Sequence, residues 1–368
     1  ERRRLGERGL SPLGAARPDM DDIMENLAVK ARGEGGARRR KPARSSLVAE
    51  AIGAELDVPA WARMLGVSAA ELPDECRFLI ESHDFGYEVL RAEERDAVLR
   101  QVFLALDADL SVSGPDRLHA WERGWGDILR RFEESGCDPL ELEPHYFRRP
   151  SRVMRLFGDY VEPRDPRFEA SFVEVIQAWV ALRYLTDASA VWEFGCGPGH
   201  NLVAFSRWLP GKPLVGLDWA EPSQEILAQV AETMQIDLVG RRFDMFAPDR
   251  SLALPEGAAV VTIGAMEQLG DRFEALLDFF RANRPRICVH LEPIHELYDQ
   301  EKLFDLFGAR YAERRGYLRG FVPRLRELER RGEVEILHVK KHLGSVFHDG
   351  WGSIVWRPRA SRSNGVPA

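Results

Sequence analysis

The chain has 368 residues, of which 45% are hydrophobic and 30% charged, so it is long enough for about two domains and can bury a core without disulfides or a structural metal. Its net charge of -8 disfavours general binding to nucleic acid. The four cysteines are scattered and form no CxxC pair, which disfavours a disulfide framework and a metal site.

No apolar run reaches the ~18 residues that a membrane span requires, and no apolar segment of the signal-peptide type follows the Arg-rich start. These features predict a cytoplasmic protein without a membrane partner. Residues 1–45 contain 12 basic and 7 acidic residues with few apolar ones, which predicts a disordered basic tail. The alternative is that its Arg-rich run binds an anionic partner. A second disordered tail is expected over 359–368.

Residues 46–140 have the periodicity of helices, and we expect a helical N-terminal cap domain there. A helix over 60–65 should stop at Gly66, and Ser68 and Glu71 form a capping box that should open the next helix. Two longer amphipathic segments are expected at about 88–106 and 115–134. Residues 141–165 are rich in Pro, Arg and aromatics and are predicted to be a linker. His145 and Tyr146 in it could form a lid, or they could simply pack on the core.

From residue 166 onward the pattern changes to strands alternating with helices, which is typical of a parallel α/β sheet. After a helix over 168–185, the strand Val191–Phe194 leads into glycines at 195, 197 and 199 and then into a helix. Glycines at a strand-to-helix turn let a ligand approach the backbone closely. The dinucleotide fingerprint G-x-G-x-x-G is absent, because its third glycine would fall at His200.

The pattern E-x-G-x-G-x-G at 193–199 resembles motif I of the class I S-adenosylmethionine (SAM)-dependent methyltransferases. Two further features match this family: a strand that ends in Asp218, and a later one followed by Asp244. The resemblance implies that SAM is the cofactor and that Asp218 accepts hydrogen bonds from the ribose, with Trp219 against the adenine. It implies that Asp244 binds the adenine amine and that Met245 contacts the ring.

The resemblance also implies that Glu193 and the three glycines of the loop bind the cofactor, together with Gly264. Glu193 would support the methionine end of SAM, or would only orient the loop. The full set of predicted cofactor-binding residues is Glu193, Gly195, Gly197, Gly199, Asp218, Trp219, Asp244, Met245 and Gly264.

Further strands are expected at 259–263 and 287–291, followed by an antiparallel pair at 333–342 and 351–356. The predicted fold class is therefore α/β, with a Rossmann-like class I methyltransferase sheet that is mostly parallel and ends in an antiparallel hairpin. The methyltransferase domain should cover residues 166–358.

Transfer of a methyl group to a hydroxyl or ammonium acceptor needs a base but no metal. Open α/β sheets hold their sites beyond the carboxyl ends of the strands. The candidates at these ends are Glu292, His295 and Glu267, as a base or as a group that orients the acceptor. His290 is expected to be a hydrogen-bonded histidine within the sheet.

The leading hypothesis is methyl transfer to a small molecule, at oxygen. Methylation of a protein or nucleic acid, and a non-catalytic SAM-binding module, are the alternatives; the acidic core disfavours nucleic acid. The basic stretch 294–331 either lines the mouth of a site for an anionic acceptor or forms a solvated face paired with nearby glutamates. The oligomeric state is left open.

Overall fold

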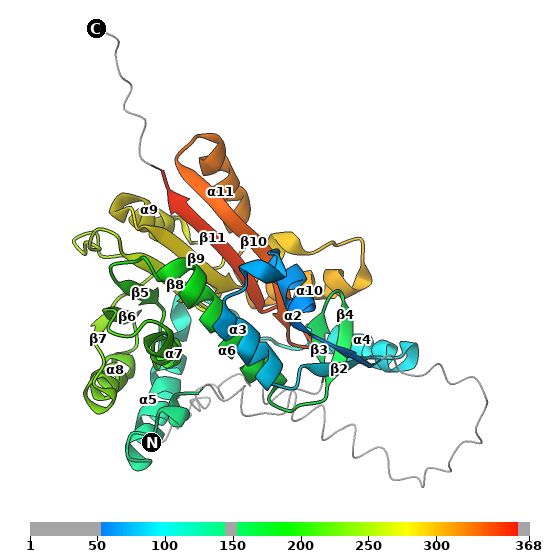
Figure 1. The fold of residues 1–368 in the computed structure, drawn as a ribbon. Helices are drawn as coiled ribbons and strands as arrows, with labels where there is room; N and C mark the ends of the chain where they lie inside the picture. Colours follow the sequence, from blue (N-terminus) through cyan, green and yellow to red (C-terminus); the bar gives the residue numbers. More distant parts are fainter. Residues whose placement is uncertain (1–52, 144–152, 360–368) are drawn as a thin grey trace, which may run out of the picture.

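The computed structural model describes residues 53–143 and 153–359 (Figure 1). In these residues eleven strands form one sheet, in the order β1-β2-β4-β3-β10-β11-β9-β8-β5-β6-β7. The predicted tails and the Arg-rich run lie outside the described residues, apart from Arg359, and so do His145 and Tyr146.

One half of the sheet is parallel. Its strands are β5 (Val191–Phe194), β6 (Leu214–Asp218), β7 (Leu238–Arg242), β8 (Ala259–Ile263) and β9 (Ile287–Glu292). They are connected by α7 (His200–Trp208), α8 (Glu221–Met234) and α9 (Glu274–Asn283). All of them except the edge strand β7 are almost entirely buried, which explains why their sequences read as short continuous apolar runs.

A C-terminal hairpin completes this part of the sheet. β10 (Val334–Gly344) pairs antiparallel with β11 (Trp351–Pro358), and β11 pairs antiparallel with β9. A parallel sheet that closes with this hairpin confirms the predicted Rossmann-like class I methyltransferase fold.

The other half of the sheet comes from the N-terminal part of the chain. Its strands are β1 (Gly53–Glu55), β2 (Gly86–Val89), β3 (Met154–Leu156) and β4 (Asp159–Pro163). We expected a helical cap domain at 46–140 and a linker at 141–165, and these four strands were not predicted. Each is only three to five residues long, so it lacks the alternating pattern that marks a strand, and it forms by pairing across the sheet.

The helices expected in this region are present. They are α2 (Val58–Leu65), α3 (Asp74–Ser82), α4 (Ala92–Leu106) and α5 (Leu118–Glu134), with short 3-10 turns η1 (Ala69–Glu71), η2 (Pro115–Arg117) and η3 (Pro139–Leu142). Gly66 ends α2 with φ 68°, as predicted. The capping box of Ser68 and Glu71 also forms, but it opens only the single turn η1, because Pro73 begins a new helix.

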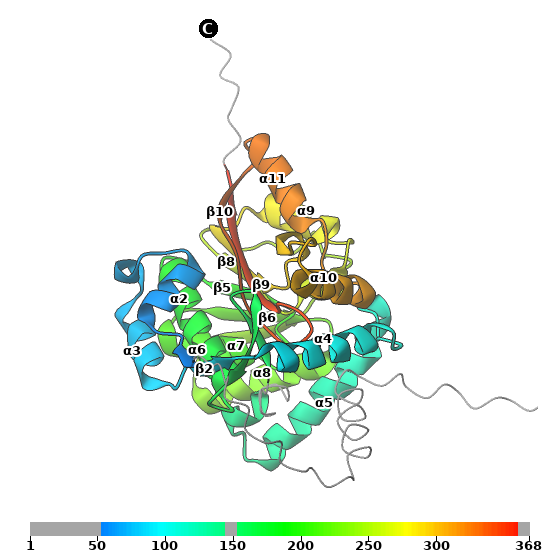
Figure 2. The same ribbon diagram turned by 90° about the vertical axis from the view of Figure 1, so that its right-hand side faces the viewer.

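Helices cover both faces of the sheet (Figure 2). α6 (Phe168–Val180) continues into a π-helical turn, Ala181–Leu185, and packs with α2, α3, α7 and α8 on one face. The other face is covered by α9 and α11 (Phe321–Arg330), while α10 (Leu303–Arg315) packs with α4. Two further 3-10 turns, η6 (Met266–Leu269) and η7 (His295–Leu297), follow β8 and β9.

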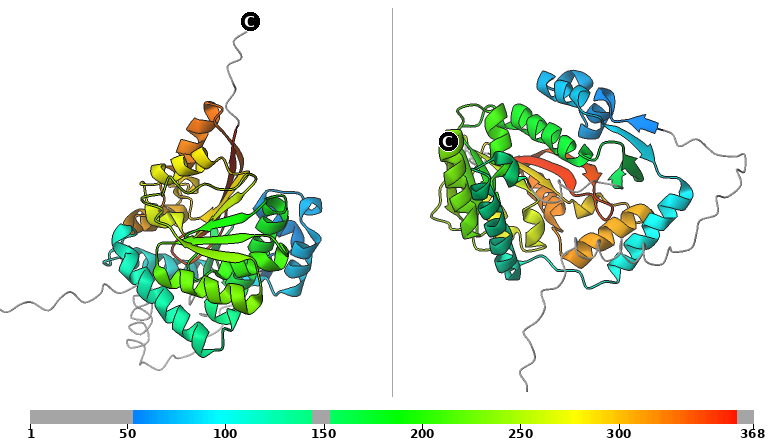
Figure 3. Two further views of the ribbon diagram at one scale, coloured as in Figure 1. Left: turned by 90° about the vertical axis from the view of Figure 1, so that its left-hand side faces the viewer. Right: turned by 90° about the horizontal axis from the view of Figure 1, so that it is seen from below.

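The helix α5 lies beside α8 (Figure 3). The side chain of Gln229 on α8 donates a hydrogen bond of 2.8 Å to Glu133 on α5. This contact brings an N-terminal helix to the parallel half of the sheet. In the described part of the chain, no helix combines the length and the apolar character that crossing a membrane requires.

Candidate functional site

The glycine loop after β5 has a backbone that only glycine adopts easily. Gly195, Gly197 and Gly199 have φ values of 72°, 52° and 80°, in the left-handed region. The loop is tied to the end of β6, because the N–H groups of Gly195 and Cys196 donate to the carbonyl oxygen of Leu217 at 2.6 and 3.0 Å. A Cβ atom on Gly195 would lie 2.4 Å from the Cβ of Ala265, so the space at this position admits no side chain.

Asp218 ends β6, and its buried carboxylate faces the same loop. Oδ2 accepts a hydrogen bond from the N–H of Gly197 and Oδ1 accepts one from Ala220, both at 2.9 Å. Burial raises the pKa of Asp218 to about 6, and these backbone donors lower it. Asp218 also lines the pocket described next, so its carboxylate lies beside any ligand bound there.

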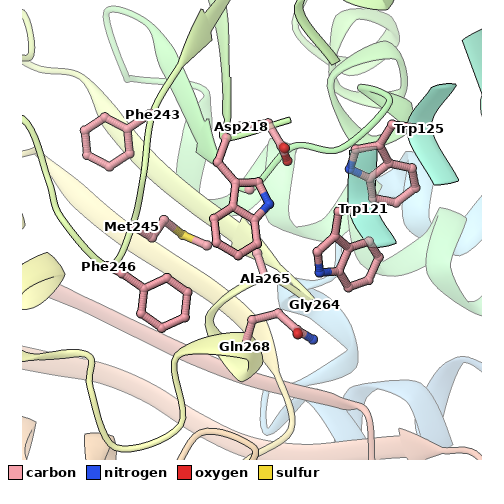
Figure 4. Close-up of a pocket in the computed structure, with 11 residues that line it drawn as sticks. Trp121, Trp125, Asp218, Phe243, Met245, Phe246, Gly264, Ala265 and Gln268 are labelled. Carbon is pink, nitrogen blue, oxygen red and sulfur yellow. The ribbon is translucent and has the colours of Figure 1, made fainter. Parts of the chain in front are cut away.

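A pocket of about 490 Å³ opens at this edge of the sheet (Figure 4). Of the predicted cofactor-binding residues, it brings together Gly195, Asp218, Trp219, Met245 and Gly264. Gly197 and Gly199 belong to the loop beside it.

Aromatic and sulfur-containing side chains form one wall of this pocket. The rings of Trp219 and Phe246 lie 5.7 Å apart, and Phe243 and Met245 line the pocket beside them. Asp244, in contrast, is exposed, and its carboxylate accepts a hydrogen bond of 2.8 Å from the N–H of Phe246. It thus holds the turn that presents the apolar side chains to the pocket.

Sequence reasoning missed the opposite wall, which comes from α5. Trp121 and Trp125 stack with ring centroids 5.2 Å apart and face the pocket across from Met245 and Phe246 (Figure 4). Trp125 also covers the glycine loop, since a Cβ on Gly197 would lie 2.9 Å from its ring. Their spacing of four residues on an amphipathic helix was visible in the sequence, but nothing in it pointed to a partner far along the chain.

Glu193 lies in β5 just before the loop and is fully buried. Its Oε1 accepts a hydrogen bond of 2.7 Å from Asn201, whereas Oε2 has no partner among the described residues. The pKa of Glu193 is raised to about 8, mainly by burial and in smaller part by the neighbouring carboxylates of Asp218 and Glu292, against the hydrogen bond from Asn201. In the described part of the chain, no ion pair involves any of these three acids.

Glu292, predicted as a base, is also fully buried, at the end of β9. Its Oε1 accepts hydrogen bonds from the N–H groups of Ala265 and Met266, and its Oε2 accepts one from Glu267, at 3.0 to 3.1 Å. Both oxygens are therefore engaged by the loop after β8. This geometry favours a positioning role for Glu292 over that of a base.

Glu267 lies in this loop, and its side chain is half-buried. Its pKa is raised to about 8, first by burial and then by the Glu292 carboxylate, while Arg315 and Arg117 oppose the shift. Gln268, which lines the pocket, donates a hydrogen bond of 3.0 Å to Glu267. Glu267 itself does not line the pocket, but its hydrogen-bond partner Gln268 does, and no hydrogen bond from a described backbone N–H to its carboxylate is found.

His295 lies at the start of η7 and lines a second, neighbouring pocket. Its Nε2 is 3.3 Å from Glu313 Oε1. His290 has the expected structural role: it bonds Thr262 and Trp356 at 2.9 Å inside the sheet, and burial lowers its pKa to about 3.

No protein-family model matches this sequence, and no curated protein matches it either. Among solved structures, the chain is similar to magnesium protoporphyrin IX methyltransferase (ChlM) from Synechocystis PCC 6803 with bound SAH, at 14% identity and a TM-score of 0.38, over 52% of this chain and 84% of that one. It is also similar to OxaC in complex with SAH and oxaline, at 15% identity and a TM-score of 0.36, over 53% and 50% of the two chains.

A third similar structure is the plantazolicin methyltransferase BpumL in complex with SAH, at 12% identity and a TM-score of 0.35, over 50% of this chain and 81% of that one. These likenesses span about half of the chain. The chain has the fold of class I SAM-dependent methyltransferases, and this assignment rests on the strand order and the terminal hairpin described above.

Proposed function

We propose that this protein is a SAM-dependent methyltransferase that methylates a small molecule at an oxygen atom. The observation that carries the proposal is the buried carboxylate of Glu193, with one oxygen unpartnered among the described residues, beside a glycine loop that approaches Asp218. A cation is the natural partner of such a group, because a buried charge is costly unless it is paired.

The charge of SAM and its aromatic base suit this site. Its ammonium and sulfonium groups are cationic, and they would compensate the buried acids Glu193 and Asp218. Its adenine would lie between the strand ends and the rings of Trp219 and Phe246. A nicotinamide dinucleotide fits poorly, because its two phosphates are anionic and would face the same carboxylates.

Bound SAM supplies an electrophilic methyl group on sulfur, and an attacking hydroxyl must lose its proton. We assign the acceptance of this proton to Glu267, whose raised pKa of about 8 suits a base near neutral pH. Glu292 would hold the loop that carries Glu267 in place. Trp121 and Trp125 would exclude water from the reacting groups.

The aromatic wall of α5 supports a small acceptor over a macromolecule. Trp121 and Trp125 narrow the approach to the strand ends, and Trp125 lies over Gly197 of the glycine loop. The proposed acceptor therefore enters beside α5 and meets the methyl group at the strand ends.

Calorimetry tests the cofactor. Titration with SAM, with its demethylated product S-adenosylhomocysteine (SAH) and with NADH should give saturable binding of the first two. Binding of NADH in the absence of SAM binding would contradict the proposal.

Incubation with methyl-labelled SAM and fractionated cell extract tests the reaction. Label in the low-mass fraction supports the proposal, and label in protein or nucleic acid supports the first alternative. If SAM binds and no fraction is labelled, the protein is a non-catalytic SAM-binding module. The Glu267→Gln variant should keep its SAM affinity and lose most of the labelling, by roughly 10²–10⁴-fold.

A further inference from the structure

A second pocket adjoins the proposed cofactor pocket and shares one loop with it. Ala265 and Gln268 of this loop line the cofactor pocket, whereas Leu269 to Arg272 line the second one, together with His295 and Arg319. The second pocket has a volume of about 670 Å³. An acceptor too large for the cofactor pocket would extend into this second pocket.

Two arginines of this pocket lack an acidic partner. No ion pair is formed by Arg272 or Arg319 with any described residue, and both side chains are exposed. Other arginines of the basic stretch do pair: Arg310 bonds Glu313 at 2.8 Å, and Arg324 bonds Glu274 at 3.0 Å. The prediction of a solvated, paired face therefore holds for Arg310 and Arg324 and not for Arg319.

The acids in the pocket do not cancel this charge. Glu313 is already engaged by Arg310 and by His295. Asp271 is the other acid, and it is exposed. The lining holds two arginines and two acids, and Arg310, which lies outside the lining, pairs with Glu313. Among the lining residues, Asp271 is therefore the acid left to oppose Arg272 and Arg319, and this suits an anionic ligand.

Arg272 connects the two pockets directly. Its guanidinium carbon lies 4.9 Å from the ring centroid of Phe246, which lines the cofactor pocket. The backbone around it is fixed as well: the N–H of Arg319 donates to Gly270 at 3.2 Å, and the hydroxyl of Ser113 donates to Gly316 at 2.6 Å. The two arginines are therefore presented by a constrained wall.

We propose that Arg272 and Arg319 bind an anionic oxygen group of the methyl acceptor, a carboxylate or a phosphate. This inference rests on the proposed function and specifies its substrate class. Gln268 of the cofactor pocket and Arg272 of the second pocket are four residues apart, so their Cα atoms are separated by no more than ~14 Å. His295, which was predicted to orient the acceptor, belongs to this subsite.

The first test uses the full chain and inorganic phosphate, without any acceptor. Phosphate should raise the thermal unfolding midpoint in a saturable way. The Arg272→Gln and Arg319→Gln variants should weaken this response by roughly tenfold in phosphate concentration. Arg326→Gln is the matched control, because Arg326 is also exposed but lines neither pocket. An equal phosphate response in all four proteins overturns the proposal, whatever the fate of the proposed function.

The second test uses methyl-labelled SAM and cell extract, with the product separated on an anion exchanger. A labelled product that is retained, and that is lost with Arg272→Gln but kept with Arg326→Gln, supports the subsite. A labelled product that is neutral or cationic overturns it and leaves the methyltransferase function intact. If no product is labelled, the proposed methyl transfer is refuted. The phosphate titration alone then tests whether Arg272 and Arg319 form an anion-binding site.

Two further treatments distinguish the sources of negative charge. If the labelled product loses its retention after phosphatase, the group is a phosphate. If it loses its retention only after esterification of carboxyl groups, the group is a carboxylate. A product unaffected by both treatments overturns the assignment of an oxygen anion.

Discussion

The two walls of the proposed cofactor pocket are built in different ways. One wall consists of the strand ends, with Gly195 and Asp218 held by backbone hydrogen bonds. The other wall is the pair Trp121 and Trp125, which reaches the pocket on a helix from the N-terminal half of the chain. The first wall is a local motif, whereas the second exists only because α5 packs beside α8.

This difference predicts that the two walls tolerate substitutions to different degrees. At the strand-end wall a single added methyl group meets a Cβ at 2.4 Å, so no adjustment is available. The α5 wall consists of half-buried side chains that can be shortened without a clash. Substitutions at the strand-end wall should therefore abolish SAM binding, and those at the α5 wall should change the affinity for SAM more moderately.

The largest effect is expected for Gly195→Ala. The left-handed backbone and the clash with Ala265 should together lower the free energy of unfolding by about 2–4 kcal/mol and abolish measurable SAM binding. Urea unfolding and calorimetry measure the two effects. The control is Gly211→Ala, which has the same φ of 72° but no atom within 4 Å of the added Cβ. It should cost only the backbone strain, and equal losses in both variants would contradict the clash.

Asp218→Asn should have the next largest effect. Loss of the charge should weaken SAM binding by about 1.5–3 kcal/mol, the scale of a hydrogen bond to a charged group. Asp244→Asn is the comparison, because Asp244 is exposed and holds only the turn at Phe246. We expect a smaller loss there by calorimetry. If Asp244→Asn proves the more damaging change, the nucleoside is bound mainly at β7.

Trp125→Ala should weaken SAM binding moderately, by about 1–2 kcal/mol, through loss of aromatic contact area over the glycine loop. The protein should remain folded, because Trp125 is only half-buried. His119→Ala provides the control on the same helix, where the side chain is 84% exposed. An unchanged affinity in Trp125→Ala would show that α5 forms no part of the cofactor site.

A further expected effect is a dependence of stability on pH. Burial raises the pKa of Glu193 to about 8 and that of Asp218 to about 6, so the folded protein binds protons that the unfolded chain has released. The free energy of unfolding of the ligand-free protein should therefore fall as the pH rises from about 4.5 to 8. Each kcal/mol lost should lower the thermal unfolding midpoint by about 2–4 °C.

SAM should counteract this fall, because its cationic groups favour the ionised carboxylates. The affinity for SAM should increase with pH over the same range, and that for SAH should increase less, since its sulfur is neutral. Thermal unfolding with each ligand at several pH values measures this. If the ratio of the SAM and SAH affinities stays constant with pH, the sulfonium group does not interact with the buried acids.

The sequence by itself determined the parallel strands, the glycine loop and the acid at the end of β6, because these features are local. A buried strand reads as an apolar run, and a loop that needs positive φ requires glycine. The same locality allowed the terminal hairpin to be predicted.

Only the tertiary structure decided the four short N-terminal strands, the aromatic wall of α5 and the roles of the candidate bases. Glu292 is a reasonable base in the sequence, yet three backbone N–H groups from the loop after β8 engage it. Likewise, Arg310 on α10 pairs with Glu313, whereas Arg319, between α10 and α11, forms no ion pair with any described residue. Which partner a side chain meets depends on contacts between distant segments, and the local pattern of a sequence does not encode these contacts.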